Sequence, residues 1–195
     1  MLTLPAQKTS TGLGIGFTLE LETYMQPADV VVLVIEDVEA LRLATVSDLE
    51  EIGYKTVSAS NGYEALEKLR LSKVDIVLSD LKMPELSGIQ VLKMMRSAGH
   101  FQPFIVISGF GTRAELVELL RLGAFDFLEK PVDFEVFKSV VAKAAELTTE
   151  QAKSRTELIK TLGISEAHLT PQLEQSVRQI ARLKTFRESK KTKEK

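Results

Sequence analysis

Five side chains of complementary chemistry follow four separate apolar runs of this 195-residue chain. They are three carboxylates, one hydroxyl and one ammonium: Glu36, Asp37, Asp80, Ser108 and Lys130. Three carboxylates held together raise the affinity for a hard divalent cation, and Mg²⁺ prefers a few carboxylates with water and phosphate oxygens. A neighbouring ammonium and hydroxyl can stabilise charge that develops on a phosphoryl group. If these groups converge, Asp80 is suited to attack phosphorus and form an acyl phosphate.

The apolar runs themselves predict the elements that would bring these groups together. Residues 30–35 are continuously apolar and rich in valine, as a strand covered on both faces must be, and such strands belong to parallel sheets. Similar runs occupy residues 54–59, 74–79, 104–108 and 124–128. Each gap is long enough for a crossover helix. The alternation predicts an α/β fold, a flavodoxin-like doubly wound five-stranded parallel sheet of the (βα)5 kind, with a C-terminal helical extension.

Helix starts between these runs support the same interpretation. Asn61 and Thr112 are candidate N-caps, each with a Glu three residues on, while Ser87 and Asp133 open two further amphipathic stretches. Ligands of doubly wound sheets bind beyond the carboxyl ends of the strands. The five polar groups are therefore expected to meet at one edge of the sheet.

Composition excludes several other classes of protein. Hydrophobic residues make up 44% and charged residues 27%, which is globular rather than disordered. The net charge of −2 gives no global cationic field for nucleic acid or anionic lipid. The absence of cysteine rules out disulfide scaffolds and thiolate metal sites, and no apolar run approaches the length needed to cross a bilayer. We expect a cytoplasmic protein with no membrane partner.

Four segments in order along the chain resemble the receiver domain of two-component response regulators. They read VIED at 34–37, LSDLKMPELSG at 78–88, ISG at 107–109 and GAFDFLEKP at 123–131. The resemblance covers about residues 29–148. It implies a phosphorelay signalling domain rather than an enzyme in the usual sense, limited to self-catalysed phosphoryl transfer and autodephosphorylation. It also implies a sensor histidine kinase or phosphotransfer protein as the phosphoryl donor.

The same resemblance assigns roles to individual residues. Asp80 is the implied phosphoacceptor, and Ser108 and Lys130 read the phosphoryl group. Mg²⁺ is the implied cofactor, with the following ligands: Glu36, Asp37, Asp80 and the backbone carbonyl of Lys82. Phe127 matches the aromatic switch position that responds with Ser108, altering the surface of the fourth helix, fifth strand and fifth helix. A cis peptide bond is implied at Pro131.

Two features depart from the commonest receiver pattern. Glu36 stands where the first Asp is more frequent, which keeps the charge. Lys82 and Phe110 occupy the positions that tune hydrolysis of the phosphoaspartate in the family, and we hypothesise that apolar Phe110 limits access of attacking water. Taken alone, Asp37 has a simpler interpretation as a helix N-cap.

The chain divides into three predicted parts. Residues 1–29 form an N-terminal extension, either an extra strand or the result of a mis-assigned start; residues 30–148 form the receiver domain; residues 149–195 form a helical extension with a basic tail. From residue 182 onward, seven Lys or Arg against two Glu give a local charge of +5. We expect this tail to be a solvated helix end, so that sequence-specific DNA binding is not predicted.

The C-terminal extension carries an apolar stripe at helical spacing. A helix is predicted over residues 134–162, ending at Gly163, and a second begins at Thr170-Pro171. Its stripe comprises Leu173, Val177, Ile180, Leu183 and Phe186. We expect it to pack on the receiver or to pair two copies as a homodimer; the cognate kinase and the downstream protein are not indicated.

Three other functions compete with phosphoryl acceptance. The first is a receiver-like interaction scaffold that does not use phosphate, against which the intact set of Glu36, Asp37, Ser108 and Lys130 argues. An FMN-binding flavodoxin would need hydrogen-bond donors where Glu36 and Asp37 stand. A phosphatase of the haloacid dehalogenase type would need a second Asp at the position of Lys82.

Overall fold

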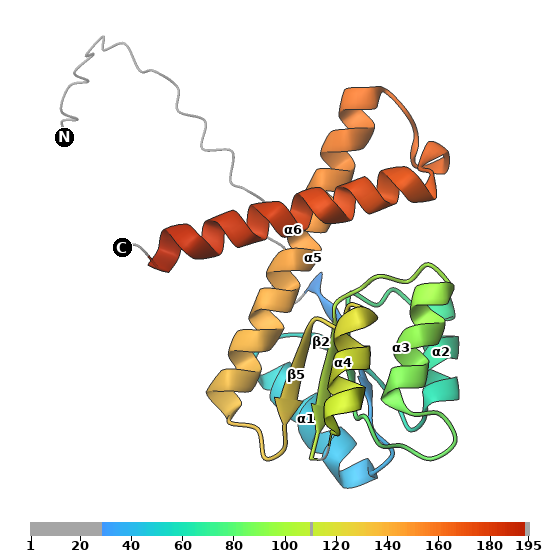
Figure 1. Ribbon diagram of the computed structural model, residues 1–195, viewed down its shortest axis with the longest axis vertical. Coiled ribbons are helices and arrows are strands. Elements are labelled where there is room, and N and C mark those ends of the chain that lie inside the picture. Colours follow the sequence, from blue (N-terminus) through green and yellow to red (C-terminus); the bar gives the residue numbers. More distant parts are fainter. Residues whose placement is uncertain (1–28, 110, 194–195) are drawn as a thin grey trace, which may run out of the picture.

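The computed structural model describes residues 29–109 and 111–193 and forms one parallel sheet with helices on both faces (Figure 1). Its elements are β1 (Val31–Ile35), α1 (Glu39–Glu51), β2 (Lys55–Ala59), α2 (Gly62–Leu71), β3 (Ile76–Ser79), α3 (Gly88–Ser97), β4 (Phe104–Ser108), α4 (Arg113–Arg121), β5 (Asp126–Glu129), α5 (Phe134–Leu162), a short 3₁₀ helix η2 (Glu166–His168) and α6 (Pro171–Lys193). The predicted extra strand and alternative start within residues 1–28 lie outside the described residues.

The five strands are all parallel and lie in the order β2-β1-β3-β4-β5. This order confirms the predicted doubly wound, flavodoxin-like fold. The chain moves outward from β1 to β2, returns to β3 on the other side of β1 and continues to β5. The reversal places the carboxyl ends of β1 and β3 side by side, which is where doubly wound sheets bind ligands.

Two apolar layers hold the helices to the sheet. On one face, α2, α3 and α4 pack on side chains such as Leu33, Val77 and Phe104. On the other face, α1 and α5 pack on Val32, Val34 and Ile76. Alternate side chains of a strand point to opposite faces, so a strand covered on both faces needs apolar residues throughout. The continuous apolar runs of the sequence meet that need.

Four helices begin where the sequence predicts. Asn61 and Asp133 cap α2 and α5 by accepting from backbone N–H groups of the first turn. Ser87 and Thr112 form complete capping boxes with Gln90 and Glu115 at the starts of α3 and α4. These caps satisfy N–H groups that have no partner within the helix.

Strand boundaries differ from the sequence prediction by one or two residues. The β3 ladder begins at Ile76 rather than Val74. Just before it, the Asp75 amide donates to the Val31 carbonyl (2.9 Å), and the Val31 amide donates to the Asp75 carboxylate (3.0 Å) instead of to a backbone carbonyl. At the edge of the sheet, β5 runs from Asp126 to Glu129 instead of ending at Leu128, because Glu129 pairs in register with Ser108. Both ends are set by the neighbouring strand.

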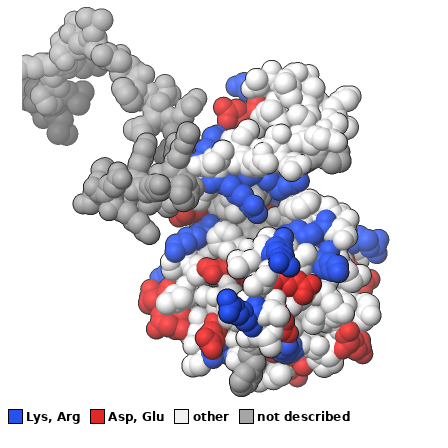
Figure 2. All heavy atoms as spheres, in the orientation of Figure 1, with Lys and Arg blue, Asp and Glu red and all other residues white. Residues whose placement is uncertain are grey.

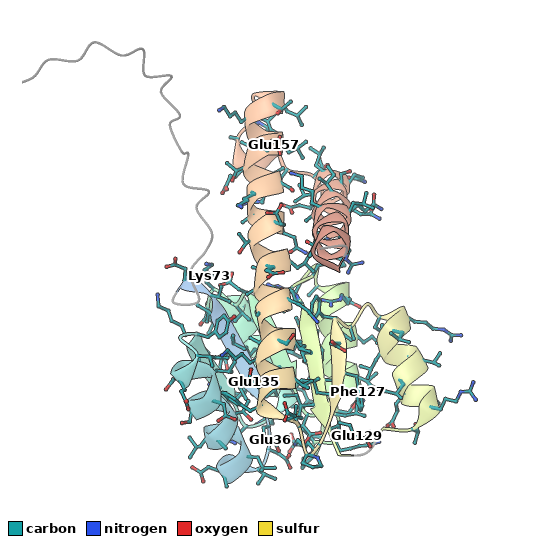
Figure 3. All side chains as sticks on the ribbon, turned by 90° about the vertical axis from the view of Figure 1, so that its left-hand side faces the viewer. Glu36, Lys73, Phe127, Glu129, Glu135 and Glu157 are labelled. Carbon is teal, nitrogen blue, oxygen red and sulfur yellow. The ribbon has the colours of Figure 1, made fainter. Side chains whose placement is uncertain are left out.

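The long helix α5 carries the C-terminal extension away from the sheet. It runs unbroken from Phe134 to Leu162. Its C-cap residue is Gly163, whose φ of +61° is a conformation that favours glycine. In Figure 3, Glu36 and Glu129 lie at one end of the sheet, whereas Glu157 lies near the far end of α5, beyond the sheet's other end. After η2 the chain turns back, and α6 packs across α5 (Figure 1).

The apolar stripe of α6 is only partly buried. Val177 and Ala181 are buried, but Ile180 and Leu183 remain 41% and 61% exposed. The buried residues Val177 and Ala181 are four positions apart on α6. Ala181 therefore lies on the buried side of the helix, where the sequence pattern predicted Ile180. Pairing of two copies through the exposed residues stays a prediction. No helix in the described part of the chain is apolar over a length that could cross a membrane.

Candidate phosphoryl-acceptor site

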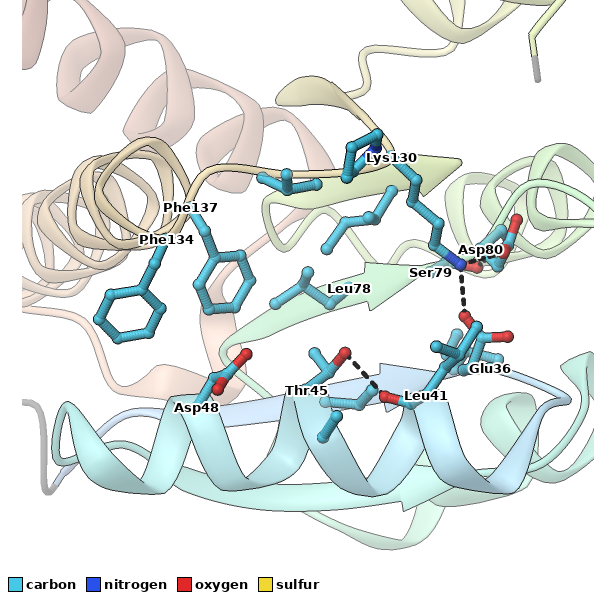
Figure 4. Close-up of a pocket in the computed structure, with 16 residues that line it drawn as sticks. Glu36, Leu41, Thr45, Asp48, Leu78, Ser79, Asp80, Lys130, Phe134 and Phe137 are labelled. Carbon is cyan, nitrogen blue, oxygen red and sulfur yellow. Dashed lines mark hydrogen bonds and ion pairs between the residues drawn. The ribbon is translucent and has the colours of Figure 1, made fainter. Parts of the chain in front are cut away.

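The polar groups of the candidate site lie at the carboxyl ends of four strands, on one edge of the sheet. Glu36 follows β1, Asp80 follows β3, Ser108 is the last residue of β4 and Lys130 follows β5. Glu36 and Ser108 are buried, and Asp80 and Lys130 are partly buried. The close-up in Figure 4 shows Lys130 extending from one side of the site towards Asp80 and Glu36 on the other.

The ammonium of Lys130 joins two of the carboxylates. Its Nζ lies 2.8 Å from Glu36 Oε2 and 2.6 Å from Asp80 Oδ2. The two carboxylate side chains are only 8% and 11% exposed. Ion pairs that are sheltered from water are screened less than surface pairs, and removing one partner leaves a costly buried charge. Lys130 is therefore the group that lets two acidic side chains share this position.

Backbone amides fix the remaining carboxylate oxygens. Asp80 Oδ1 accepts from the Lys82 amide at 2.9 Å, and Glu36 Oε1 accepts from the Val38 amide at 3.3 Å. Helix α1 has Val38 as its N-cap residue, with no side-chain cap bond. Asp37 thus does not serve as the cap of α1. It lies partly exposed beside Glu36.

These contacts set the protonation of Asp80 and Lys130. Burial has the largest influence on the pKa of Asp80 and raises it, but hydrogen bonds from Lys130 and the Lys82 amide, the charge of Lys130 and the Ser108 hydroxyl together hold it below its ordinary value. For Lys130, burial lowers the pKa most strongly, yet the bonds and charges of Asp80 and Glu36 leave it raised. Asp80 is therefore an ionised carboxylate at neutral pH beside a charged ammonium.

Lys82 connects the site to α4, a contact that the sequence reasoning did not foresee. The backbone amide of Lys82 binds Asp80, while its Nζ forms an ion pair with Glu115 in the first turn of α4. Glu115 also completes the capping box of Thr112. The capping-box pattern in the sequence predicts only this local contact between Glu115 and Thr112. The link to Lys82 spans 33 positions and has no sequence signal.

Phe127, the predicted switch residue, lies beside the start of α4. Phe127 on β5 packs against the core cluster beneath α2, α3 and α4. A Cβ added at Gly111 would lie 3.3 Å from the Phe127 ring, so the chain before α4 passes close to the aromatic edge. Phe110, the predicted hydrolysis-tuning residue, lies outside the described residues. The Lys130-Pro131 peptide bond is cis.

A glycine fixes the backbone that carries Asp80. A Cβ at Gly88, the first residue of α3, would lie 2.3 Å from the Asp80 carbonyl oxygen and 3.1 Å from Ser79 Oγ. We expect Gly88→Ala to lower the free energy of unfolding by about 1–3 kcal/mol, because either α3 or the β3 terminus must shift. Urea denaturation measures the change.

Gly109→Ala is the matched control for that substitution. Its Cβ would meet only Lys130 Cβ, at an ordinary 3.9 Å, so the unfolding free energy should stay close to wild type. Equal stability of the Gly88 and Gly109 variants would contradict the close packing of α3 on Asp80.

The donor set suits a hard divalent cation. Glu36, Asp37 and Asp80 offer carboxylate oxygens, and Lys130 supplies one positive charge against three negative ones. This excess charge matches a divalent ion, and oxygen donors match Mg²⁺. Among the residues that the structure describes, no three His, Cys, Asp or Glu side chains already converge to metal-binding distance. Lys130 instead holds the Glu36 and Asp80 carboxylates.

The site opens into a hollow of about 520 Å³ between α1 and the start of α5. Asp80 and Lys130 lie at one end, and Asp48, Phe134 and Phe137 line the other (Figure 4). The wall is largely apolar; three of its charged residues, Glu36, Asp80 and Lys130, lie at the strand ends, and the fourth, Asp48, lies on α1.

Comparison with known proteins agrees with this geometry. The response regulator receiver domain pattern matches residues 32–142. The regulatory protein AtoC of Escherichia coli is 35% identical over 126 residues, which are 64% of this chain and 27% of AtoC. The transcriptional regulatory protein ZraR of Klebsiella oxytoca is 36% identical over 92 residues, 47% of this chain and 21% of ZraR. The chain thus spans about a quarter of the length of these relatives.

Solved structures show the same likeness. A response regulator receiver protein from Pseudomonas putida shares 32% identity at a TM-score of 0.57, covering 58% of this chain and 96% of its own. The receiver domain of the Francisella response regulator 1452 shares 30% identity at a TM-score of 0.57, covering 60% and 98%. Since the receiver-domain pattern also matches more than half of the sequence, the chain belongs to the response regulator receiver domain family.

Proposed function

We propose that this chain accepts a phosphoryl group on Asp80 from the phosphohistidine of a sensor histidine kinase or phosphotransfer protein, using Mg²⁺. The single observation that carries this proposal is the Lys130 ammonium, which lies 2.6 Å from Asp80 and 2.8 Å from Glu36 at the end of the sheet. A receiver-like scaffold that does not use phosphate has no need of this charged cluster, which is costly to bury.

The chemistry follows from the charges of these residues. The lowered pKa of Asp80 keeps a carboxylate oxygen ready as the nucleophile. That oxygen forms a new bond to phosphorus as the bond to the donor nitrogen breaks. Negative charge then gathers on the phosphoryl oxygens, where Lys130 and the Ser108 hydroxyl are placed to stabilise it. Preorganised donors of this kind are the protein's main contribution to phosphoryl transfer.

The cation would be held by three carboxylates, two of which Lys130 joins. Glu36, Asp37 and Asp80 would be its side-chain ligands, with the backbone carbonyl of Lys82 as a further oxygen. When bound, Mg²⁺ neutralises charge on the phosphoryl oxygens and on the acidic side chains. Its affinity should fall at a pH acid enough to protonate Asp80, whose pKa is lowered.

Phosphorylation would change the surface formed by α4, β5 and α5, which a downstream protein would recognise. A phosphoryl group on Asp80 competes for Lys130 and the Ser108 hydroxyl, and movement of Ser108 would free space for the Phe127 ring. The Lys82–Glu115 ion pair gives the site a second connection to the start of α4. Local charge changes act in this way when they bias an element with two arrangements.

Incubation of the whole chain with acetyl phosphate tests the proposal without a partner. We expect one added phosphoryl group by intact-mass spectrometry when Mg²⁺ is present, because the acceptor and its stabilising groups belong to one chain. Excess EDTA should abolish the addition. A wild-type protein that gains no phosphoryl mass at any Mg²⁺ concentration would instead favour the scaffold function.

A further inference from the structure

A second polar hollow lies at the opposite end of the sheet from Asp80. Residues that precede β4 and β5, including Phe101 and Gly123, line it together with the ends of α3 and α4 and the first half of α6. Its volume is about 610 Å³. Four arginines line this arginine hollow, and its lining contains no Asp or Glu: Arg96, Arg121, Arg178 and Arg182. Figure 2 shows Lys and Arg side chains gathered where α6 faces the body of the domain.

Arg96 supplies a fixed positive charge at the base of this hollow. Its guanidinium donates to the backbone carbonyls of His100, Gln102, Leu122 and Gly123 at 2.9–3.2 Å. It therefore ties the end of α3 to the loops before β4 and β5. Burial, followed by the charges of Arg182 and Arg178, lowers the pKa of Arg96 to about 10. The three cations thus repel one another.

Among the described residues, none of the four arginines forms an ion pair. The charge of Glu174 acts on Arg178 without forming an ion pair with it. Glu174, one helical turn before Arg178, has its Oε1 3.0 Å from Arg155 Nε instead. Backbone carbonyls of the loops before β4 and β5 offset the charge of Arg96. Arg121 lies in the last turn of α4, where the helix dipole favours a cation, and Arg182 projects from an exposed position on α6. The hollow therefore carries excess positive charge.

Phe101 holds two of the guanidinium groups in place. The Arg178 guanidinium lies 3.9 Å from the centre of the Phe101 ring, and that of Arg96 lies 5.7 Å from it. Stacking on an aromatic face limits the motion of an arginine side chain without using its N–H groups. Arg96 already donates to four backbone carbonyls, so of these two arginines it is Arg178 that would donate to an anion. Amide side chains of Gln175 and Gln179 add neutral donors on the α6 side. Ordered donors lower the entropy cost of binding an anion.

We propose that the arginine hollow binds a small soluble ligand with at least two adjacent phosphate groups, such as an oligophosphate or a nucleoside polyphosphate. Guanidinium groups match phosphate oxygens in two-pronged hydrogen bonds, and several arginines call for more than one phosphate. The concave shape and a volume within the range of small-molecule sites favour a compact ligand over an extended nucleic acid strand. Such a ligand would fasten α6 to the ends of α3 and α4.

Titration calorimetry with sodium tripolyphosphate tests this site on the full chain. EDTA is included and Mg²⁺ omitted, which keeps the acidic site out of the measurement, and ionic strength is held constant. We expect saturable binding at one site, with inorganic phosphate binding about tenfold more weakly. The absence of saturable binding of tripolyphosphate would overturn the proposal.

Paired variants assign the binding to the hollow. The double variant Arg121→Gln with Arg182→Gln should weaken tripolyphosphate binding by at least about tenfold, since two charge-assisted contacts are lost. Arg70→Gln is the control: Arg70 is also exposed near the end of a helix, does not line the hollow, and should change the affinity less than about twofold. Circular dichroism should show that all variants keep the wild-type fold.

Two results would contradict the assignment. An equal loss of affinity in the Arg70 and Arg121/Arg182 variants would mean that only general charge attracts the anion. Tighter binding of a short DNA duplex than of tripolyphosphate, dependent on the same two arginines, would identify the surface as a nucleic acid contact instead.

Discussion

Asp80→Asn is expected to eliminate phosphoryl uptake from acetyl phosphate completely. The amide nitrogen that replaces a carboxylate oxygen cannot attack phosphorus as an anion, and the remaining amide oxygen is a poor nucleophile. The substitution keeps the size and shape of the side chain, and the amide oxygen can still accept from the Lys82 backbone. Intact-mass spectrometry with excess acetyl phosphate and Mg²⁺ should show wild type with one added phosphoryl group and the variant with none.

Asp48→Asn provides the control within the same hollow. Asp48 lies on α1 and lines the opening that leads to Asp80, but it is far from Lys130 in Figure 4. We expect its phosphoryl uptake to match wild type. Undiminished uptake in the Asp80 variant would show that another carboxylate, such as Glu36 or Asp37, accepts the group, and would refute the assignment of Asp80. Loss of uptake in both variants would show that the hollow itself was disturbed.

The sheet and the strand-end groups could be predicted because each depends on a local or repetitive signal. A strand buried on both faces has to be apolar throughout, as residues 31–35 are, and parallel strands end at one edge. Helix caps such as Ser87 with Gln90 involve residues three positions apart, so their pattern is visible in the sequence. Together these signals place Asp80 and Lys130 at the same edge.

Contacts between distant surface side chains could not be predicted in this way. The pairing of Lys82 with Glu115 depends on how α4 packs beside the β3–α3 loop, and neither residue has a pattern that requires the other. Likewise, Phe101 and Arg178 meet only because the chain turns back after α5 and η2, so that α6 lies against the domain. The sequence also did not indicate which side of α6 is buried, because the small Ala181 is buried while the larger Ile180 is exposed.

Lys130→Met should separate two effects of the ammonium, namely its support for phosphoryl transfer and its competition with a cation. Methionine keeps an unbranched side chain but removes the positive charge between Glu36 and Asp80. The rate of phosphorylation by acetyl phosphate should fall on the order of 100-fold, because a preorganised donor to the phosphoryl oxygens is lost. The pKa of Asp80 should rise, since Lys130 holds it below its ordinary value.

The affinity for Mg²⁺ should change in the opposite direction. Two carboxylates that no longer share an ammonium leave more negative charge for the cation, and a nearby positive charge no longer repels it. We therefore expect Mg²⁺ to bind several-fold more tightly at neutral pH while phosphorylation slows. Lys138→Met, an exposed lysine on α5, should alter neither quantity. Weaker Mg²⁺ binding in the Lys130 variant would show that the lysine positions the carboxylates for the metal, whereas unchanged phosphorylation would exclude it from the stabilisation of the transferring group.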